Sequence, residues 1–328
     1  MCENILGIKN LKAYYKVLKG EVKAVDDISL NIRKGEILGL AGESGCGKST
    51  LASTLISRKP PLHYISGDVR LLGKDIMEMN QAEFQKMRLR NISLIPQYAL
   101  DAFSPTKKIK TLIRDLVQEH GISTGRKFFN KVEERLELVN LTPSVLNRYS
   151  IELSGGMKQR VIMVVSTILD PELIIADEIT SALDVSSQRF VATMLANLRD
   201  KGIIGSAIFI THDLSILYQI AERLMIMYAG HFTELGPTDE IVNKARHPYT
   251  RALIASLPQV GIQYRDKKLS GIKGTPPYLL NIGEGCRFRY RCPYAVEQCA
   301  KTPVREKVAE GHYVSCWRWK ELGSDHNG

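Results

Sequence analysis

Apolar and polar positions along this chain alternate between strand-like and helix-like patterns. In the segment 157–169 the apolar residues recur at i, i+3, i+4 and i+7 and predict an amphipathic helix; they are Val161, Val164, Val165 and Ile168. A second helix is expected at 186–200. Apolar runs of strand length lie at 36–41, 92–95, 173–176 and 207–210. Strands that alternate with helices in this way predict an α/β fold, a parallel sheet with helices on its faces.

The remaining pattern predicts the organisation around that sheet. Short apolar runs near the N-terminus, separated by polar and glycine turns, predict strands at 5–8, 22–25 and 28–32. Residues 98–152 have a helical pattern, which we interpret as an insertion. A hairpin is expected from the runs at 225–228 and 232–235. The proline pair at 276–277 then precedes a cysteine-rich tail, so we expect one domain over 1–260 and a small C-terminal domain over 261–328.

A glycine-rich turn follows the strand at 36–41. Residues 42–49 fit the pattern GxxxxGK[ST] in full, and they open a helix, which is the context that this phosphate-binding motif requires. The glycines let backbone N–H groups surround a phosphate, and the helix N-terminus adds its dipole. We expect Lys48 to reach the β- and γ-phosphates and the Ser49 hydroxyl to bind Mg²⁺.

Two further motifs point to the same chemistry. Asp177 and Glu178 follow the apolar run 173–176, which places two carboxylates at the carboxyl edge of a buried strand, where open α/β sheets bind ligands. Asp177 is expected to hold Mg²⁺, and Glu178 to lie near the attacking water. Residues 153–156 read Leu-Ser-Gly-Gly, so Ser154 can cap the next helix while the glycines leave N–H groups open to an anion.

In this order, the motifs resemble those of the ATP-binding subunit of an ABC transporter. The resemblance covers about residues 5–260 and implies a P-loop NTPase of the ABC type, with a RecA-like core, an antiparallel β subdomain and a helical subdomain at about 98–152. It implies that ATP is sandwiched between the phosphate loop of one chain and the Leu-Ser-Gly-Gly signature of another. Ile179 departs from the family, which usually has proline there, but we expect activity to survive because this position touches no phosphate.

The resemblance also assigns roles to individual residues. It makes Glu178 the catalytic base, His212 the switch histidine that contacts the γ-phosphate, and Gln97 a ligand of Mg²⁺ and water beside Ser49 and Asp177. Tyr15 would stack on adenine, with Tyr14 as the neighbouring candidate. The expected ATP-binding residues are Tyr15, Gly42, Glu43, Ser44, Gly45, Cys46, Gly47, Lys48, Ser49, Thr50, Ser154, Gly155, Gly156, Gln159 and Asp184.

The C-terminal third narrows the resemblance to the dipeptide/oligopeptide importer family. The block 247–253 reads His-Pro-Tyr-Thr-Arg-Ala-Leu and is followed by Leu257-Pro258, and blocks at 274–277, 285–288 and 291–293 also match. The implied partners are two transmembrane permease subunits, a second related ATP-binding subunit or a second copy of this chain, and indirectly an extracellular peptide-binding protein. No apolar run approaches the length of a membrane span, so we expect a peripheral protein at the cytoplasmic face of the membrane. An importer of nickel or another solute is the main alternative.

Charge and cysteine content are both concentrated in the tail. The formal net charge is +10, and residues 261–328 hold 12 Lys and Arg against 7 Asp and Glu. Four of the six cysteines also lie there, and in a cytosolic chain such a cluster favours a metal site over disulfides; they are Cys286, Cys292, Cys299 and Cys316. Their spacing lacks the knuckles typical of zinc sites. We therefore favour a [4Fe–4S] cluster, with Zn²⁺ as the alternative. Arg287, Arg289 and Arg291 would offset the charge of such a cluster or form a solvated basic face.

A soluble ABC ATPase that acts on nucleic acid is another interpretation of a basic chain with these motifs. Repair-type members carry long coiled coils inside the ATPase, and the stretch between Gln97 and Ser154 leaves no room for one. Translation-type members usually carry two cassettes, whereas this chain has one. We therefore expect no nucleic-acid partner.

Overall fold

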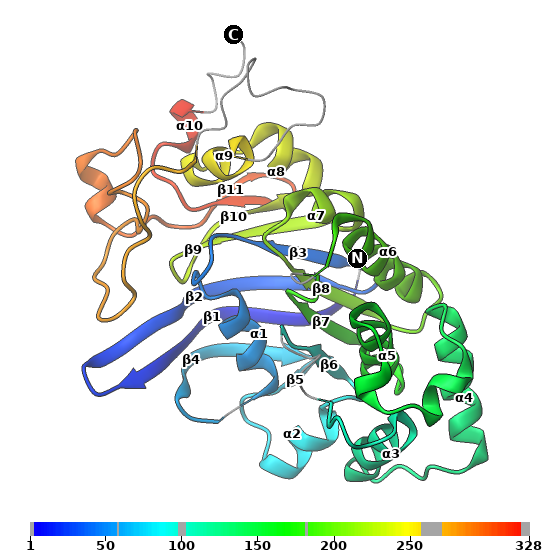
Figure 1. Ribbon diagram of the computed structural model, residues 1–328. Helices are drawn as coiled ribbons and strands as arrows, with labels where there is room; N and C mark the ends of the chain where they lie inside the picture. Colours follow the sequence, from blue (N-terminus) through cyan, green and yellow to red (C-terminus); the bar gives the residue numbers. More distant parts are fainter. Residues whose placement is uncertain (1–2, 58, 98–102, 181–182, 257–270, 323–328) are drawn as a thin grey trace.

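Two β-sheets organise the molecule in the computed structural model, which describes residues 3–57, 59–97, 103–180, 183–256 and 271–322 (Figure 1). The larger sheet has the strand order β11-β12-β10-β9-β3-β8-β7-β6. Its centre is parallel and comprises β9 (Arg223–Tyr228), β3 (Ile37–Ala41), β8 (Ser206–Ile210), β7 (Leu173–Asp177) and β6 (Ile92–Ile95). The predicted parallel sheet is thus confirmed. The four apolar runs form β3, β6, β7 and β8, and these strands pair in parallel.

The central strands are buried on both faces. In β3, Ile37 and Ala41 belong to the hydrophobic core on one side of the sheet, whereas Leu38 and Leu40 belong to the core on the other side. Successive side chains of a strand point to opposite faces, so a strand covered on both sides must be apolar at every position. This is why the four runs were continuous rather than alternating.

The second sheet is antiparallel, in the order β2-β1-β4-β5, and it is joined to the main sheet through the second core. Its strands are β1 (Asn4–Val17), β2 (Gly20–Arg33), β4 (Leu62–Leu71) and β5 (Lys74–Asp75). The two short strands expected at 22–25 and 28–32 are one strand, β2, because a register shift takes up the interruption at Asp26 and Asp27, where Asp27 has a φ of 62°. A bulge of this kind keeps a strand paired across an extra residue.

Helices cover both faces of the main sheet. α1 (Lys48–Ile56) packs in the core between the two sheets, and the helices of residues 109–167 form the green and cyan group beside β6 and β7 (Figure 1). The expected helical insertion is present in the described part of 98–152. The helices in chain order are α2 (Gln81–Met87), α3 (Ile109–Glu119), α4 (Arg126–Leu138), α5 (Gly155–Thr167), α6 (Val185–Asp200), α7 (Leu214–Ile220), α8 (Thr238–Lys244), α9 (Pro248–Ala255) and α10 (Trp319–Leu322), with 3₁₀ turns at Pro143–Asn147, Ser150–Glu152 and Glu297–Ala300.

The C-terminal segment does not form the separate cysteine-rich domain that the sequence predicts. β12 (His312–Val314) pairs with β10 (His231–Pro237), and β11 (Glu306–Ala309) pairs with β12, so the segment extends the main sheet. At this junction the buried carboxylate of Glu234 accepts a hydrogen bond from His312 at 2.8 Å. The expected boundary at residue 260 lies outside the described residues.

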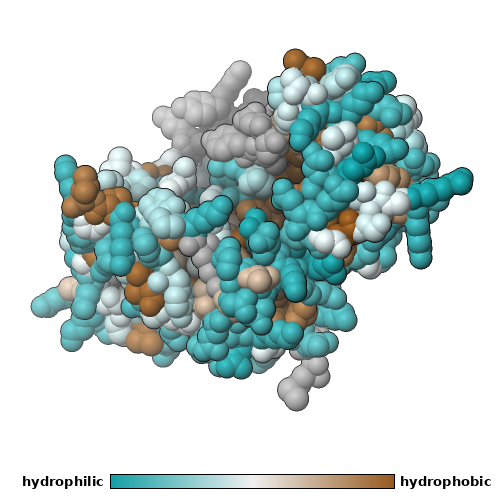
Figure 2. Space-filling view, turned by 90° about the horizontal axis from the view of Figure 1, so that it is seen from below, coloured by the Kyte–Doolittle hydropathy of each residue, from teal (hydrophilic) through white to brown (hydrophobic). Residues whose placement is uncertain are grey.

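Within the described residues, no helix combines the length and the apolarity that a bilayer crossing requires. The face shown in Figure 2 is mainly hydrophilic, with scattered hydrophobic patches. On this face, therefore, apolar side chains do not gather into one broad area.

Candidate functional site

Four neighbouring strands deliver the predicted site residues to one edge of the main sheet. The strand order β3-β8-β7-β6 places their carboxyl ends side by side. Gly42 follows β3, His212 lies two residues after β8, Asp177 ends β7, and Gln97 lies two residues after β6. Residues that are far apart in the sequence therefore meet at the edge where open α/β sheets bind ligands.

The phosphate loop is fixed by its glycines and by Lys48. Gly42 and Gly47 have positive φ values, 150° and 105°, and a Cβ atom there would lie 2.1 Å from the Met227 carbonyl oxygen and 2.0 Å from that of Ala24. Only glycine fits such conformations next to another backbone. The buried Lys48 amine donates hydrogen bonds to the carbonyls of Gly42 at 2.8 Å and Glu43 at 3.1 Å. The loop carbonyls thus hold the Lys48 amine, and its contact with the phosphates stays a prediction.

Ser49 and Asp177 form an oxygen pair beside the loop. The Ser49 hydroxyl donates to Asp177 Oδ1 at 3.0 Å. Burial raises the pKa of Asp177, the Glu178 charge adds to this, and the hydrogen bond from Ser49 opposes it. A carboxylate whose ionised form is disfavoured in this way gains most from a nearby cation. The pair fits Mg²⁺, which binds through one or two side-chain oxygens together with substrate phosphates.

Glu178 is held in an unusual backbone conformation. Its φ is 48°, in the left-handed region that non-glycine residues rarely adopt, and its N–H donates to the Ile210 carbonyl of β8 at 2.9 Å. Gln97 Nε2 donates to Glu178 Oε2 at 2.8 Å. Strain of this kind persists where the surroundings impose it and is typical of active sites. Glu178 and Gln97, expected separately as base and ligand, are therefore in direct contact.

The structure separates the two tyrosines that were candidates for adenine stacking. Tyr14 is buried, and its hydroxyl donates to Asp26 at 2.6 Å. Tyr15 is only partly buried, and its hydroxyl lies 3.2 Å from that of Thr50, at the start of α1. Tyr15 is the one beside the phosphate loop, and its role in stacking stays a prediction.

The Leu-Ser-Gly-Gly signature lies at the start of α5, and Asp184 lies at the start of α6. Ser154 caps α5 by accepting from the Met157 N–H at 3.3 Å, and Gly155 is exposed. Asp184 caps α6 by accepting from Ser187, and hydrogen bonds from the Ser186 hydroxyl and from Ser187 hold the pKa of its carboxyl well below the usual range. No hydrogen bond joins the signature to the phosphate loop in the described part of the chain. The roles of the signature and of Asp184 in ATP binding stay predictions, and positions 181–182 lie outside the described residues.

Sequence reasoning missed two residues that contact the phosphate loop from the C-terminal part of the chain. The Tyr249 hydroxyl accepts from the Glu43 N–H at 2.8 Å, and Arg291 forms a two-point ion pair with the Glu43 carboxylate. Their sequence separations from Glu43, 206 and 248 residues, left no local signal. The alternating arginines at 287, 289 and 291 are the available clue, but their pattern alone predicts side chains that face a cluster or solvent.

The four tail cysteines lie around one small cavity. Cys286, Cys292, Cys299 and Cys316 all line it, together with Trp317 and Arg318. Burial raises the pKa of Cys286 to about 12 and that of Cys316 to about 11, and neighbouring cysteines contribute to both shifts. Among the described residues, however, no group of three or more His, Cys, Asp or Glu side chains is placed to hold a metal ion. The expected metal centre is therefore not shown.

The fold and this sheet edge define a nucleoside triphosphatase of the P-loop class. Residues 25–181 match the family model of the ABC transporter, and residues 233–299 match that of the oligopeptide/dipeptide transporter, C-terminal region. The dimeric bacterial ABC transporter cassette MJ0796 has the same fold, with a TM-score of 0.62 at 23% identity over 71% of this chain and 98% of that one.

Proteins of similar length match almost the whole of this chain in sequence. The dipeptide transport ATP-binding protein DppD of Caldanaerobacter subterraneus is 38% identical, over 97% of this chain and 98% of its own. The oligopeptide transport ATP-binding proteins AppF of Bacillus subtilis and OppF of Salmonella typhimurium are 37% and 38% identical, over 96% and 95% of this chain and 97% and 95% of theirs. The chain belongs to this family of ABC transporter ATP-binding proteins, and it is an ATPase.

Proposed function

We propose that this ATPase powers the import of dipeptides or oligopeptides through a membrane permease. Two observations together support the proposal. The side chains of Ser49 and Asp177, and those of Gln97 and Glu178, form hydrogen bonds at the carboxyl edge of the main sheet, and residues 233–299 match the oligopeptide/dipeptide transporter C-terminal region. The family relationship, with relatives named for peptide transport, supports the choice of cargo. The cytoplasmic face of the membrane is then the location, reached through the permease.

We infer the following roles for the residues of the edge. Lys48 and the loop N–H groups bind the β- and γ-phosphates, where they stabilise negative charge. Glu178 accepts a proton from water as the water oxygen attacks the γ-phosphorus, and the bond to the bridging oxygen of ADP breaks. Gln97 orients the Glu178 carboxylate through its hydrogen bond, and His212 contacts the γ-phosphate in this proposal. Ser49 and Asp177 would hold Mg²⁺, which supplies positive charge to the phosphates when bound.

We further propose that two such chains, or this chain and a related subunit, enclose each nucleotide. Ser154 and Gly155 are exposed at the start of α5, where a second molecule can reach them. The solved cassette with this fold is dimeric. Closing of the pair on ATP and its release after hydrolysis would then move two permease subunits.

Peptide transport is tested with the complete transporter. The chain, its permease and any companion ATP-binding subunit are reconstituted in vesicles together with the peptide-binding protein, and ATP hydrolysis is measured with and without peptide. We expect peptide to stimulate hydrolysis several-fold and labelled peptide to be transported. Stimulation by nickel and not by peptide would contradict the choice of cargo, and salt-dependent binding of DNA without any peptide response would contradict the transporter assignment.

The four tail cysteines surround one small cavity, and thiols are the ligands of iron–sulfur clusters. Their spacing in the sequence lacks the knuckles that are typical of zinc sites. We therefore propose that Cys286, Cys292, Cys299 and Cys316 hold a [4Fe–4S] cluster, which would brace the tail.

Cys292→Ser should remove nearly all bound iron, because the cluster would lose one of four thiolate ligands. Iron and acid-labile sulfide per chain, measured after anaerobic purification, provide the test. Cys2→Ser is the matched control and should leave both quantities unchanged, since Cys2 is distant from the tail in sequence. Stoichiometric zinc without acid-labile sulfide in the wild-type protein would contradict the cluster.

A further inference from the structure

The segment 286–292, between the first two tail cysteines, is joined to the ATPase by two of its three arginines. Arg287 pairs with Asp26 of β2, and Arg291 pairs with Glu43 of the phosphate loop. Arg289 is different: within the described residues it donates hydrogen bonds to Glu284, Ala300 and Tyr290, all in the tail. Arg287 and Arg291 therefore contact the ATPase, whereas Arg289 contacts the tail. This corrects the expectation that all three arginines offset the charge of a cluster or form a solvated basic face.

Arg291 makes a full set of hydrogen bonds. Its two terminal nitrogens donate to the two Glu43 carboxylate oxygens at 2.6 and 2.9 Å. The other donors go to the Tyr228 hydroxyl at 3.0 Å and to the carbonyls of Lys273 at 2.8 Å and Ile272 at 3.2 Å. The Arg291 side chain is only 6% exposed and that of Glu43 is 23% exposed. A two-point pair with so little access to water fixes geometry as well as charge.

Glu43 connects Arg291 to Lys48, the lysine of the phosphate loop. Its carboxylate is held by Arg291, its N–H by the Tyr249 hydroxyl, and its carbonyl accepts from Lys48 Nζ at 3.1 Å. The carboxylate, the N–H and the carbonyl of Glu43 are therefore all hydrogen-bonded. Glu43 alone thus separates Arg291 from the Lys48 amine, which is expected to bind the β- and γ-phosphates.

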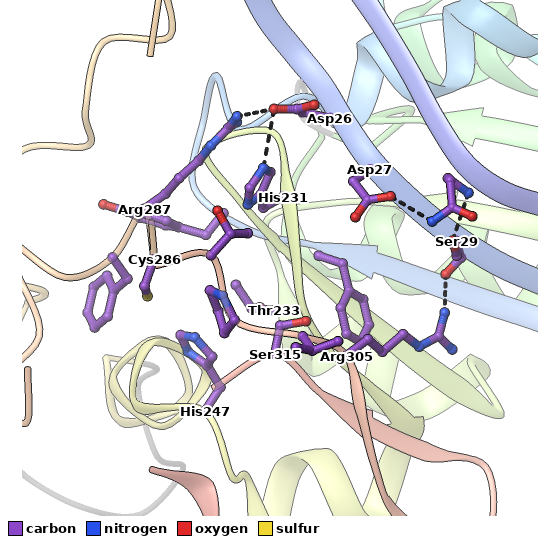
Figure 3. A pocket seen from close by; sticks show the side chains of 17 residues that line it. Asp26, Asp27, Ser29, His231, Thr233, His247, Cys286, Arg287, Arg305 and Ser315 are labelled. Atoms are coloured by element: carbon purple, nitrogen blue, oxygen red, sulfur yellow. Dashed lines mark hydrogen bonds and ion pairs between the residues drawn. The ribbon is translucent and has the colours of Figure 1, made fainter. Parts of the chain in front are cut away.

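Arg287 supports the neighbouring turn in the same way. Figure 3 shows it reaching Asp26, which also interacts with His231. Arg287 donates to the Ala229 carbonyl as well, and the next residue, Gly230, donates its N–H to the Cys46 carbonyl of the phosphate loop at 2.8 Å. The loop is thus held at two points, directly through Glu43 and indirectly through Cys46.

We propose that Arg291 is a positioning residue for nucleotide binding, which acts through Glu43 to hold the phosphate loop and Lys48 in the binding conformation. The proposal rests on the proposed phosphate-binding role of Lys48. A loop that is competent only part of the time binds with its affinity reduced by that fraction. Chemistry at Glu178 is unaffected once nucleotide is bound. The expected effect therefore falls on KM and on nucleotide Kd, and not on kcat.

The test compares full-length Arg291→Gln with Arg289→Gln, a matched control from the same segment. Arg291→Gln should raise the Kd for ADP and for ATP about tenfold, as measured by calorimetry, and leave kcat at saturating ATP within about twofold. Arg289→Gln should bind as the wild type does. Glu43→Gln should resemble Arg291→Gln, and the double variant should be no weaker than either single one, since the two residues act as a pair.

Each result separates this inference from the proposed function. Wild-type affinity in folded Arg291→Gln, or additive losses in the double variant, would overturn the positioning role alone. A fall in kcat without a change in Kd would do the same. If Arg291→Gln does not fold, Glu43→Gln carries the test, because Arg291 keeps its contacts with Tyr228 and the two carbonyls. A wild-type chain that binds no nucleotide would overturn the proposed function as well.

Discussion

Glu178→Gln is expected to bind ATP as the wild type does and to hydrolyse it roughly 10²- to 10⁴-fold more slowly, the range typical of losing a general base. The amide is the same size as the carboxylate and can still accept the hydrogen bond from Gln97, so the left-handed backbone at this position and the sheet edge are retained. It cannot take a proton from water. Single-turnover hydrolysis of labelled ATP, with binding measured in parallel, provides the measurement.

The control for this variant is Glu172→Gln, the same chemical change just before the amino end of the same strand, β7. Glu172 lies before the amino end of β7, whereas the phosphate loop lies at the carboxyl ends of the strands. The Glu172→Gln variant should therefore hydrolyse ATP at the wild-type rate. Wild-type turnover in Glu178→Gln would remove Glu178 from its role. Weakened ATP binding in that variant would instead assign it to binding.

Lys48→Ala is expected to lower the affinity for ATP by roughly 10- to 100-fold or more, because a hydrogen bond to a charged group contributes about 1.5–3 kcal/mol. Lys48 is only 5% exposed, so little water can replace its amine. The variant also removes the lysine donor from the Gly42 and Glu43 carbonyls, of which the Glu43 carbonyl keeps the hydrogen bond from the Cys46 N–H at 3.2 Å. Calorimetric titration with ATP and Mg²⁺ measures the loss directly.

Lys74→Ala is the matched control, because Lys74 is exposed on β5 of the other sheet and no hydrogen bond ties it to the phosphate loop. It should bind ATP with wild-type affinity. Unchanged affinity in Lys48→Ala, in a chain that melts at the wild-type temperature, would exclude the lysine from phosphate binding.

The parallel sheet and the ATP motifs were predictable because their signals are local. A strand buried on both faces is apolar at every position, and a phosphate loop needs its glycines and lysine within eight residues. The family resemblance then assigned Gln97, and the structure places it against Glu178. That contact depends on the neighbouring positions of β6 and β7 in the sheet, which spacing alone does not encode.

The misjudged features depend on contacts between distant segments. The two strands expected at 22–25 and 28–32 fuse into one because a bulge absorbs Asp26 and Asp27, and a charged pair in sequence looks like a turn. Arg287 and Arg291 looked like a basic face because their acidic partners, Asp26 and Glu43, lie more than 240 positions away. Charge patterns show how much charge a segment carries, but not which residue faces it.

The pairing of β12 with β10 has a consequence for how the chain can be divided. If the chain ended near residue 260, β10 would become a bare sheet edge, with unpaired N–H and C=O groups that invite aggregation. The Glu234 carboxylate, fully buried, would lose its imidazole partner. The tail thus completes the main sheet of the ATPase through β12 and β11. The tail and the rest of the chain are therefore expected to unfold together as one cooperative unit.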